Sequence, residues 1–288
     1  MFQKLLIANR GEIAVRIIRA CREMGILTVA VFSEPDREAL HVKMADEAVC
    51  IGSAAAKDSY LNMDRILNAA LITNAQAIHP GFGFLSENDQ FAEKCQDWGV
   101  VFVGPSSELI RKMGNKSVAK ETMRQAGIPV IEGSKEPVFD SGEALRQAER
   151  IGFPVMVKAA FGGGGKGMRI VSEKSEFESL FRLAQQEAIR SFGDSTMYLE
   201  KYIQNPRHVE VQIVADSFGN VICLGERDCS VQRRHQKMIE ESPCTVLEDE
   251  TRLHLHKAAV KAAKAVGYES AGTVEFCATV MGISISWR

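Results

Sequence analysis

The stretch KLLIANRGEIAVRIIRACREMGILTVAVF, residues 4–32, decides the fold class of this chain. It begins with KLLIA, a short apolar run that predicts a buried strand. A helix is predicted next, because apolar side chains then recur at helical spacing. They are Ile13, Ile17, Ile18, Cys21 and Met24, and Gly25 is a typical helix stop. The β-branched run LTVAVF, residues 27–32, predicts a second buried strand, so the stretch indicates a strand–helix–strand unit.

The same alternation continues through the first hundred residues. Further strands are predicted at Ala48–Gly52, Ala75–Pro80 and Val100–Gly104. Helices are predicted over Tyr60–Leu71 and Glu87–Trp98. This pattern favours an open parallel sheet with ligand-binding loops at the carboxyl ends of its strands. A mixed sheet with one antiparallel edge is the alternative.

A second unit is predicted to start near Met113. Helices are expected over Lys116–Ala126, Ser141–Ile151, Ser175–Arg190 and Glu250–Val266. Strands are expected over Gly127–Ser134, Pro154–Ala160, Met168–Val171, Met197–Ile203, His208–Asp216 and Val221–Val231, with AGTVEF, residues 271–276, as the last. The run VEVQIV alternates apolar and polar residues, as a half-buried antiparallel strand does.

Composition narrows the class of protein. The 288 residues carry a formal net charge of −2, and 45% of them are hydrophobic, as in globular proteins. The near-zero charge favours neither nucleic acid nor an anionic membrane as a partner, and no apolar run reaches the roughly 18 residues of a membrane span. Seven cysteines without a CxxC pair favour reduced thiols. We therefore expect a cytoplasmic protein with no nucleic-acid and no membrane partner.

The sharpest local feature is the glycine-rich run FGGGGKGM, residues 161–168, between two predicted strands. Consecutive glycines let backbone N–H groups approach an anion closely. Lys158 and Lys166 can supply positive charge beside them. The run lacks the GK[ST] ending of a P-loop, so we interpret it as a mobile lid over phosphates. An ordinary flexible hairpin is the alternative.

Two further candidates allow a functional and a purely structural interpretation. Lys116 begins a predicted helix and is either a phosphate ligand or a solvated surface lysine. Residues Glu200–Ile203 end a strand and can offer backbone donors and acceptors to a flat heteroaromatic ring. A plain edge strand is the alternative for this segment.

Charged residues gather near the C-terminal third of the chain. The run Arg227, Asp228, Arg233, Arg234, His235 and Lys237 is either a solvated face or a site for small anions. Glu275 lies in the apolar strand AGTVEF, where a carboxylate needs a cation or strong donors, so we expect a Mg²⁺ ligand. His208, before VEVQIV, is either functional or a structural cap or hinge residue.

Taken together, ordered blocks of the sequence resemble the biotin carboxylases, which are ATP-grasp ligases. The blocks are KLLIANRGEIAVRIIRACREMGI from Lys4, AIHPGFGFLSEN from Ala77, GPSSELIRKMGNKSVAKETMRQAGIPV from Gly104, PVMVKAAFGGGGKGMRIV from Pro154, EKYIQNPRHVEVQIVAD from Glu200, GERDCSVQRRHQKMIEESP from Gly225 and AGTVEF from Ala271. The resemblance implies an α/β fold: a Rossmann-like pre-ATP-grasp domain over residues 1–112, then an incomplete ATP-grasp domain over 113–288. A small α+β lid is implied at about residues 131–202 of that second domain.

The resemblance also implies a reaction and its residues. ATP would phosphorylate bicarbonate to carboxyphosphate, and biotin on a carrier protein would then be carboxylated. The implied ATP-binding residues are Lys116, Lys158, Gly163, Gly164, Gly165, Lys166, Gly167, Met168, Glu200, Lys201, Ile203, His208, Gln232 and His235. Lys237 matches a bicarbonate-binding lysine and is implied to be catalytic together with His235, while Glu275 matches a ligand of Mg²⁺ or Mn²⁺. Phe82 replaces a tyrosine that many relatives carry near the presumed biotin pocket.

Several partners and alternatives follow from the resemblance. The expected partners are a biotin carboxyl carrier protein, carboxyltransferase subunits and a second copy of the chain in a homodimer, as in acetyl-CoA carboxylase. The N-terminal part of a pyruvate or acyl-CoA carboxylase is an alternative, as is a non-catalytic ATP-binding fragment. A ligase like carbamoyl-phosphate synthetase shares bicarbonate phosphorylation but fits the RGEIAVRIIRAC and HPGFGFLSEN blocks less well.

The resemblance stops at Cys277, where the chain continues as ATVMGISISWR. This tail has neither the Glu-Met-Asn stretch nor the Arg-Ile-Gln-Val-Glu-His run that supply a second metal carboxylate, an arginine and a general base in the family. Codons for Thr279–Arg288 can be chosen that regroup into a family-like hairpin, so we hypothesise a frameshift near Cys277; a divergent tail is the alternative. The sequence therefore leads us to expect poor stability and little carboxylation activity.

Overall fold

The computed structural model describes residues 2–114, 116–134, 136–159, 167–233, 236–279 and 282–285, with backbone only for residues 116–117, 192, 279 and 282–285. The chain divides into two compact units. The first contains residues 1–119, 214–221 and 266–272, and the second contains residues 120–213, 222–265 and 273–288.

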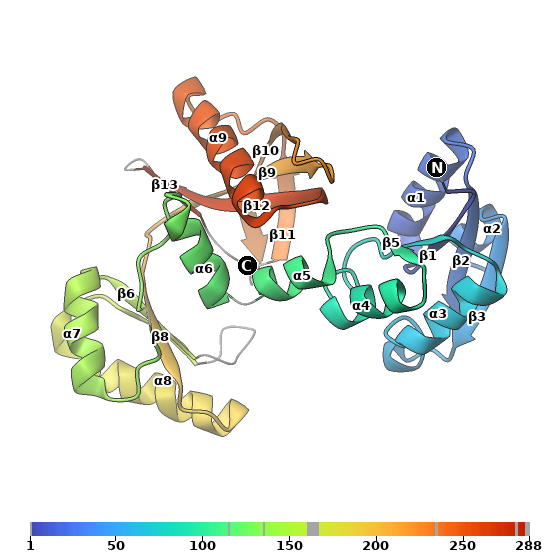
Figure 1. Ribbon diagram of the computed structural model, residues 1–288. Coiled ribbons are helices and arrows are strands. Elements are labelled where there is room, and N and C mark those ends of the chain that lie inside the picture. Colours follow the sequence, from blue (N-terminus) through green and yellow to red (C-terminus); the bar gives the residue numbers. More distant parts are fainter. Residues whose placement is uncertain are drawn as a thin grey trace. The chain divides into compact units, whose positions relative to one another are not determined.

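The first unit is built around a five-stranded sheet with the strand order β3-β2-β1-β4-β5 (Figure 1). Its strands are β1 (Lys4–Ile7), β2 (Leu27–Ser33), β3 (Glu47–Gly52), β4 (Ala77–His79) and β5 (Val101–Phe102). Its helices are α1 (Gly11–Glu23), α2 (Leu40–Met44), α3 (Met63–Ile72), α4 (Asp89–Asp97) and α5 (Ser107–Gly114). Every neighbouring pair of strands is parallel, which confirms the predicted open parallel sheet over the mixed alternative.

Helices cover both faces of this sheet. Successive residues of a strand point to opposite faces, so β1 contributes side chains to the core on each side. On one face, Leu5 and Ile7 of β1 pack against Ile18 of α1. On the other face, Leu6 of β1 lies in a core cluster with Phe91 of α4 and with apolar residues of α3. The central strands β1 and β2 are therefore buried on both sides, as their continuous apolar runs predict, whereas the edge strand β3 is largely exposed.

The second unit contains a small sheet with the order β7-β6-β8, made of β6 (Val155–Ala159), β7 (Met168–Val171) and β8 (Met197–Lys201). Both strand pairs are antiparallel, so β6 and β7 form the hairpin that the sequence predicts around the glycine-rich run. Helices α7 (Ser141–Ile151) and α8 (Phe177–Phe192) pack on this sheet (Figure 1). The rings of Phe177 and Phe181 of α8 stack with centroids 5.8 Å apart inside this core.

A second five-stranded sheet has the order β11-β10-β9-β12-β13. Its strands are β9 (Arg207–Ala215), β10 (Val221–Arg233), β11 (Gln236–Glu241), β12 (Ser270–Thr279) and β13 (Gly282–Ile285). Helix α9 (Asp249–Val266) precedes β12 and buries a row of small and apolar residues that includes Leu255 and Ala259. Helix α6 (Lys116–Gln125) precedes the small sheet.

The structure corrects two sequence predictions and adds elements that the sequence did not predict, among them helices α2 and α5 and strand β11. No regular strand forms over residues 127–134; instead, a single bridge from Gly133 to Glu200 joins this segment to β8. The run AGTVEF is not the last strand, because β12 extends beyond it and pairs with β13, with Phe276 opposite Ile285. Strand β11 was not predicted, since most of its side chains are exposed and its sequence QKMIEE does not alternate.

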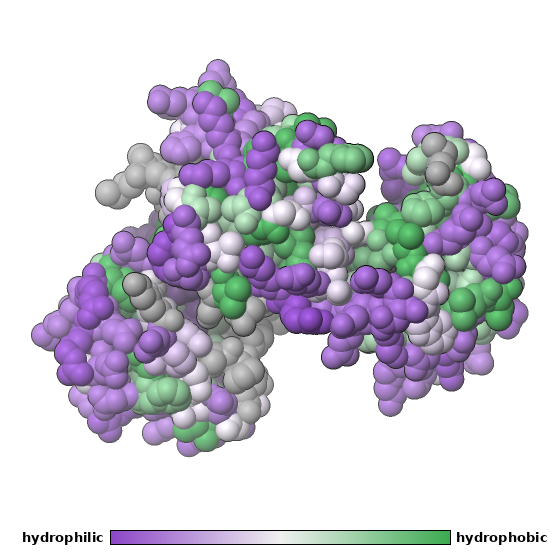
Figure 2. Space-filling view, in the orientation of Figure 1, coloured by the Kyte–Doolittle hydropathy of each residue, from purple (hydrophilic) through white to green (hydrophobic). Residues whose placement is uncertain are grey.

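The surface is mixed in character. Figure 2 shows hydrophilic residues interspersed with patches of hydrophobic ones on the face in view. Exposed apolar side chains of this kind are ordinary in globular proteins. Among the described residues, no helix combines the length and the apolar character that crossing a membrane requires.

Candidate functional site

One group of charged side chains lies on the small sheet. Strand β8 carries Glu200 opposite Met156 of β6, and Lys158 lies two residues further along β6, on the same face. The Lys158 ammonium donates a hydrogen bond to Oε2 of Glu200. Lys120 of α6 donates to the other oxygen, with Nζ 3.0 Å from Oε1. One carboxylate therefore binds two ammonium groups, and the group carries a net positive charge.

Glu200 stays ionised in this environment. Burial acts to raise the pKa of Glu200, but the positive charges of Lys158 and Lys120 outweigh it and lower that pKa below its usual value. The carboxylate is therefore an acceptor at neutral pH, with a surplus of positive charge beside it. Such a group can attract an anion such as a nucleotide phosphate.

Strand β7, which follows the glycine-rich run, begins beside these residues. Met168 of β7 pairs with Lys158 of β6. Gly167 has φ of +68°, and a Cβ there would lie 2.8 Å from the Cβ of Ala159, so only glycine fits without strain. Arg169 holds the start of β7 against α8, because it donates to the backbone oxygen of Met168 at 2.7 Å and pairs with Glu187 of α8 at 2.9 Å.

The segment that ends β8 is held by hydrogen bonds within the protein. The backbone N–H of Lys201 donates to the oxygen of Glu132, and its side-chain Nζ donates to the oxygens of Gly152 and Phe153 at 2.8 and 2.9 Å. Ile203 follows the strand and is partly buried. The predicted ring-binding segment 200–203 thus has a fixed backbone, with Glu200 at its start.

A second group of charges lies on the β9–β13 sheet. Lys237 of β11 donates to Oε1 of Glu275 of β12 at 2.6 Å and also to Oε2 of Glu210 of β9. Arg227 of β10 donates from Nε to Oε1 of Glu210 at 2.6 Å. The Glu210 side chain is only 6% exposed, so this carboxylate depends on its two cationic partners.

These contacts fix the charges of the group. Partial burial acts to lower the pKa of Lys237, but its hydrogen bonds to Glu210 and Glu275 raise that pKa well above the usual value. Burial acts to raise the pKa of Glu210, and the bonds from Lys237 and Arg227 lower it overall. Lys237 is therefore a permanent cation at neutral pH, and a small anion there would compete with the two carboxylates for its ammonium group.

Other predicted residues lie beside Lys237. One narrow gap, with no space for a water molecule, is lined by His208, Val209, Glu210, Cys229, Lys237, Glu275 and Phe276. The backbone N–H of His208 donates to Oγ of Ser230 at 3.1 Å. Gln232 lies opposite Lys237 in the β10–β11 pair and donates from Nε2 to the oxygen of Cys229 at 2.8 Å. The structure thus brings His208, Gln232, Lys237 and Glu275 together.

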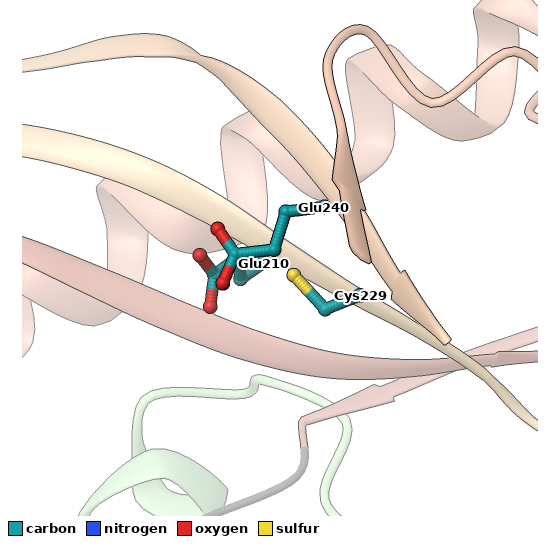
Figure 3. A group of neighbouring side chains, drawn as sticks. All are labelled: Glu210, Cys229 and Glu240. Atoms are coloured by element: carbon teal, nitrogen blue, oxygen red, sulfur yellow. The ribbon is translucent and has the colours of Figure 1, made fainter. Parts of the chain in front are cut away.

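Figure 3 shows a neighbouring group, Glu210, Cys229 and Glu240, whose ligand atoms lie within 4.8 Å of one another. We assign no metal to it. Arg227 and Lys237 already bind the Glu210 carboxylate. Burial and the nearby Glu210 raise the pKa of the Cys229 thiol to about 12, whereas a metal needs the thiolate.

Some predicted residues cannot be compared with the structure. Gly163, Gly164, Gly165, Lys166 and His235 lie outside the described residues, and Lys116 is described only as the backbone that begins α6. Two other residues were missed by the sequence analysis. Glu210 shares the polar face of β9 with His208, a period-two signal that was available. Lys120 follows Lys116 by one helical turn.

The chain matches two families of known domains. Residues 1–110 match the family described as "Biotin carboxylase, N-terminal domain", and residues 115–282 match "Carbamoyl-phosphate synthase L chain, ATP binding domain". Biotin carboxylase 1 of Bacillus subtilis is 59% identical over 276 residues, which are 96% of this chain and 61% of that protein. The chain belongs to the biotin carboxylase family.

Solved structures of this family have the same fold. A Campylobacter jejuni biotin carboxylase, crystallised as a β-γ-ATP complex, is 52% identical with a TM-score of 0.90, over 99% of this chain and 64% of that one. The biotin carboxylase domain dimer of Hydrogenobacter thermophilus 2-oxoglutarate carboxylase, in complex with MgADP, ADP and bicarbonate, is 50% identical with a TM-score of 0.87, over 100% of this chain and 64% of that one. This chain thus spans about three-fifths of the length of each of these three relatives.

Proposed function

We propose that this chain takes part in the ATP- and bicarbonate-dependent carboxylation of biotin on a biotin carboxyl carrier protein. Support comes first from Lys237, a protonated lysine on the β9–β13 sheet that donates to both Glu210 and Glu275. It comes also from the family, which includes a structure in complex with MgADP and bicarbonate. The Lys237 arrangement is the observation that carries the proposal.

The two groups of charges suit the two halves of such a reaction. In the first step an oxygen of bicarbonate attacks the γ-phosphorus of ATP, which gives ADP and carboxyphosphate. Lys158 would bind nucleotide phosphates and Glu200 would accept from the adenine amino group, while Lys237 would neutralise bicarbonate. Carboxyphosphate then breaks down to CO₂ and phosphate, the phosphate accepts the proton from N1 of biotin, and N1 forms a bond to the carbon of CO₂. The work of the protein is positioning and charge neutralisation.

The predicted metal ligand fits the chemistry of a divalent cation with phosphates. Mg²⁺ at such sites is commonly held by one or two carboxylates together with phosphate oxygens. Glu275 offers a carboxylate, of which Oε1 accepts from Lys237. Glu275 would therefore hold Mg²⁺ or Mn²⁺ beside Lys237, and the cation would supply charge neutralisation at the phosphate oxygens.

We propose the acetyl-CoA carboxylase system as the setting, with carboxyltransferase subunits as further partners and a homodimer as the assembly. The 2-oxoglutarate carboxylase relative was crystallised as a domain dimer, which supports a dimer here. Because that relative serves another carboxylase, a carboxylase for a different acceptor than acetyl-CoA is the alternative setting. Carboxyl transfer from the charged carrier to acetyl-CoA, pyruvate or 2-oxoglutarate would distinguish these settings.

The test is ADP release by the 288-residue chain with ATP, Mg²⁺, bicarbonate and biotin. The proposed function requires release that depends on both bicarbonate and biotin and that Lys237→Met reduces. The matched control is Lys257→Met, which removes an exposed lysine of α9. ATP binding without bicarbonate-dependent release would instead support the non-catalytic nucleotide-binding alternative. Failure to bind ATP at all would contradict both functions.

A further inference from the structure

We propose that Lys120 is a positioning residue of the nucleotide site: it keeps the Glu200 carboxylate paired when Lys158 leaves it for nucleotide phosphates. This inference rests on the proposed ATP-binding function. Its basis is the arrangement of two ammonium groups on the two oxygens of one carboxylate, with Lys120 on Oε1 and Lys158 on Oε2.

The geometry assigns different tasks to the two lysines. Lys120 is the more enclosed, with 19% of its side chain exposed against 35% for Lys158. Lys158 also lies opposite Met168, in the hairpin that carries the glycine-rich run. Lys158 is therefore the lysine that can turn toward an incoming phosphate, and Lys120 is the one that stays with Glu200.

The chemistry makes a second lysine useful. Glu200 and a phosphate are both anions, so they compete for the Lys158 ammonium. A partly buried carboxylate left without a cation is costly, so Glu200 alone would retain Lys158. With Lys120 at 3.0 Å, Glu200 keeps one charged partner after Lys158 moves. Lys120 therefore lowers the free energy needed to transfer Lys158 from carboxylate to phosphate.

The neighbouring backbone keeps space for this arrangement. Gly133 forms a bridge to Glu200, and a Cβ on Gly133 would lie 3.2 Å from Cγ of Glu200 and 3.4 Å from Nζ of Lys120. The same Cβ would lie 2.5 Å from the backbone oxygen of Leu199. A glycine at this position thus lets α6, residue 133 and β8 approach closely enough for Lys120 to reach Glu200.

A double-mutant cycle tests the inference, with ATP affinity measured by isothermal titration calorimetry on the whole chain. We expect Lys120→Met to weaken ATP binding about tenfold, which corresponds to about 1.4 kcal/mol. In the Glu200→Gln background, where no carboxylate competes for Lys158, the same substitution should change affinity less than about twofold. Lys120→Arg should retain most of the affinity, since it keeps the charge.

The control is Lys174→Met, which removes a lysine that pairs with Glu149 on the exposed surface of the same subdomain. It should leave ATP affinity unchanged, and thermal unfolding shows whether each variant is folded. If Lys120→Met does not fold, Lys120→Gln takes its place. An equal loss of affinity in both Glu200 backgrounds, or no loss in either, overturns the inference. A wild-type chain that does not bind ATP overturns the proposed function, and the inference with it.

Discussion

Nζ of Lys237 lies 2.6 Å from Oε1 of Glu275, and these two residues come from β11 and β12, which are separated in the sheet by β10 and β9. The contact spans the sheet because Glu210, on the intervening strand β9, also accepts from Lys237. A single lysine thus donates to two carboxylates from two strands, and Arg227 supplies a second positive charge at Glu210. The same cation that we propose to bind bicarbonate also stabilises the sheet that carries it.

The first prediction concerns the removal of this cation. Lys237→Met should lower the free energy of unfolding by about 1–3 kcal/mol, because it leaves a charged group at Glu275 unpaired and takes one of two partners from buried Glu210. Urea unfolding followed by circular dichroism measures the change. Lys237→Met combined with Glu275→Gln should recover part of the lost free energy of unfolding. If the double variant is no more stable than Lys237→Met alone, Glu275 is not the affected partner.

The second prediction concerns acid stability and Glu226 of β10. This carboxylate is 2% exposed; Oε1 accepts from Nε of Arg252 at 2.9 Å, and Oε2 lies 2.6 Å from Nε2 of His256. Burial acts to raise the pKa of Glu226, but Arg252 and His256 lower it overall. A carboxyl group with a depressed folded-state pKa stabilises the fold above its unfolded pKa and loses that contribution as pH falls through the folded pKa.

We therefore expect the chain to lose stability progressively below about pH 4.3, the ordinary glutamate value. Glu226→Gln should cost about 1–3 kcal/mol at pH 7 and less at pH 3, because protonation removes the same charge in the wild type. The thermal unfolding temperature across pH 3–7 measures this difference. Glu250→Gln, at the start of α9, is the control, and equal costs of Glu226→Gln at both pH values would contradict the prediction.

Much of the fold could be predicted from the sequence because its signals are local. The helical spacing of Ile17, Ile18 and Cys21 predicts α1, and the alternation in VEVQIV predicts β9. The extent of β12 and the existence of β13 depend on pairing between strands, and β11 is too exposed to alternate. Single-strand patterns carry none of that information.

The residues of the candidate site also divide into those with a local sequence signal and those that only long-range contacts identify. Lys158, Glu200, Lys237 and Glu275 could be selected from the sequence, because residue type, glycine-rich context and family resemblance point to them. Their partners could not. Lys120 reaches Glu200 across 80 positions of the chain, and Glu210 reaches Lys237 across 27. Only the fold brings these carboxylates and ammonium groups together, and the identity of each partner decides the pKa of Glu200 and Lys237.

The third prediction concerns Gly167, near the end of the glycine-rich run 161–168. Gly167→Ala should destabilise the chain for two reasons, a positive φ of +68° and a Cβ only 2.8 Å from that of Ala159. Gly193→Ala is a matched control, because Gly193 has φ of +73° and an added Cβ would have no atom of the described residues within 4 Å. We expect about 1 kcal/mol for Gly193→Ala and at least about 1 kcal/mol more for Gly167→Ala, measured by urea unfolding. Equal costs would show that the Ala159 contact relaxes freely.

The last prediction concerns Asn9, which follows β1 and is 3% exposed. Its Nδ2 donates to the backbone oxygens of Pro80 at 2.7 Å and Phe82 at 2.8 Å, and its Oδ1 accepts from the N–H of Arg10 at 2.9 Å. Asn9→Asp keeps the size and the acceptor but places a second oxygen against two carbonyl oxygens. It should therefore loosen the loop that carries exposed Phe82.

We expect Asn9→Asp to lower the free energy of unfolding by about 2 kcal/mol or more, because a buried charged group would face two acceptors. Chymotrypsin should also cleave the variant after Phe82 faster than the wild type, since cleavage of a folded loop requires local opening. Asn62→Asp is the matched control, because Asn62 accepts through its oxygen from the backbone N–H of Arg65 at the start of α3, a contact that aspartate retains. If Asn9→Asp and Asn62→Asp give the same stability and the same cleavage rate, then the two bonds from Nδ2 of Asn9 do not hold the loop.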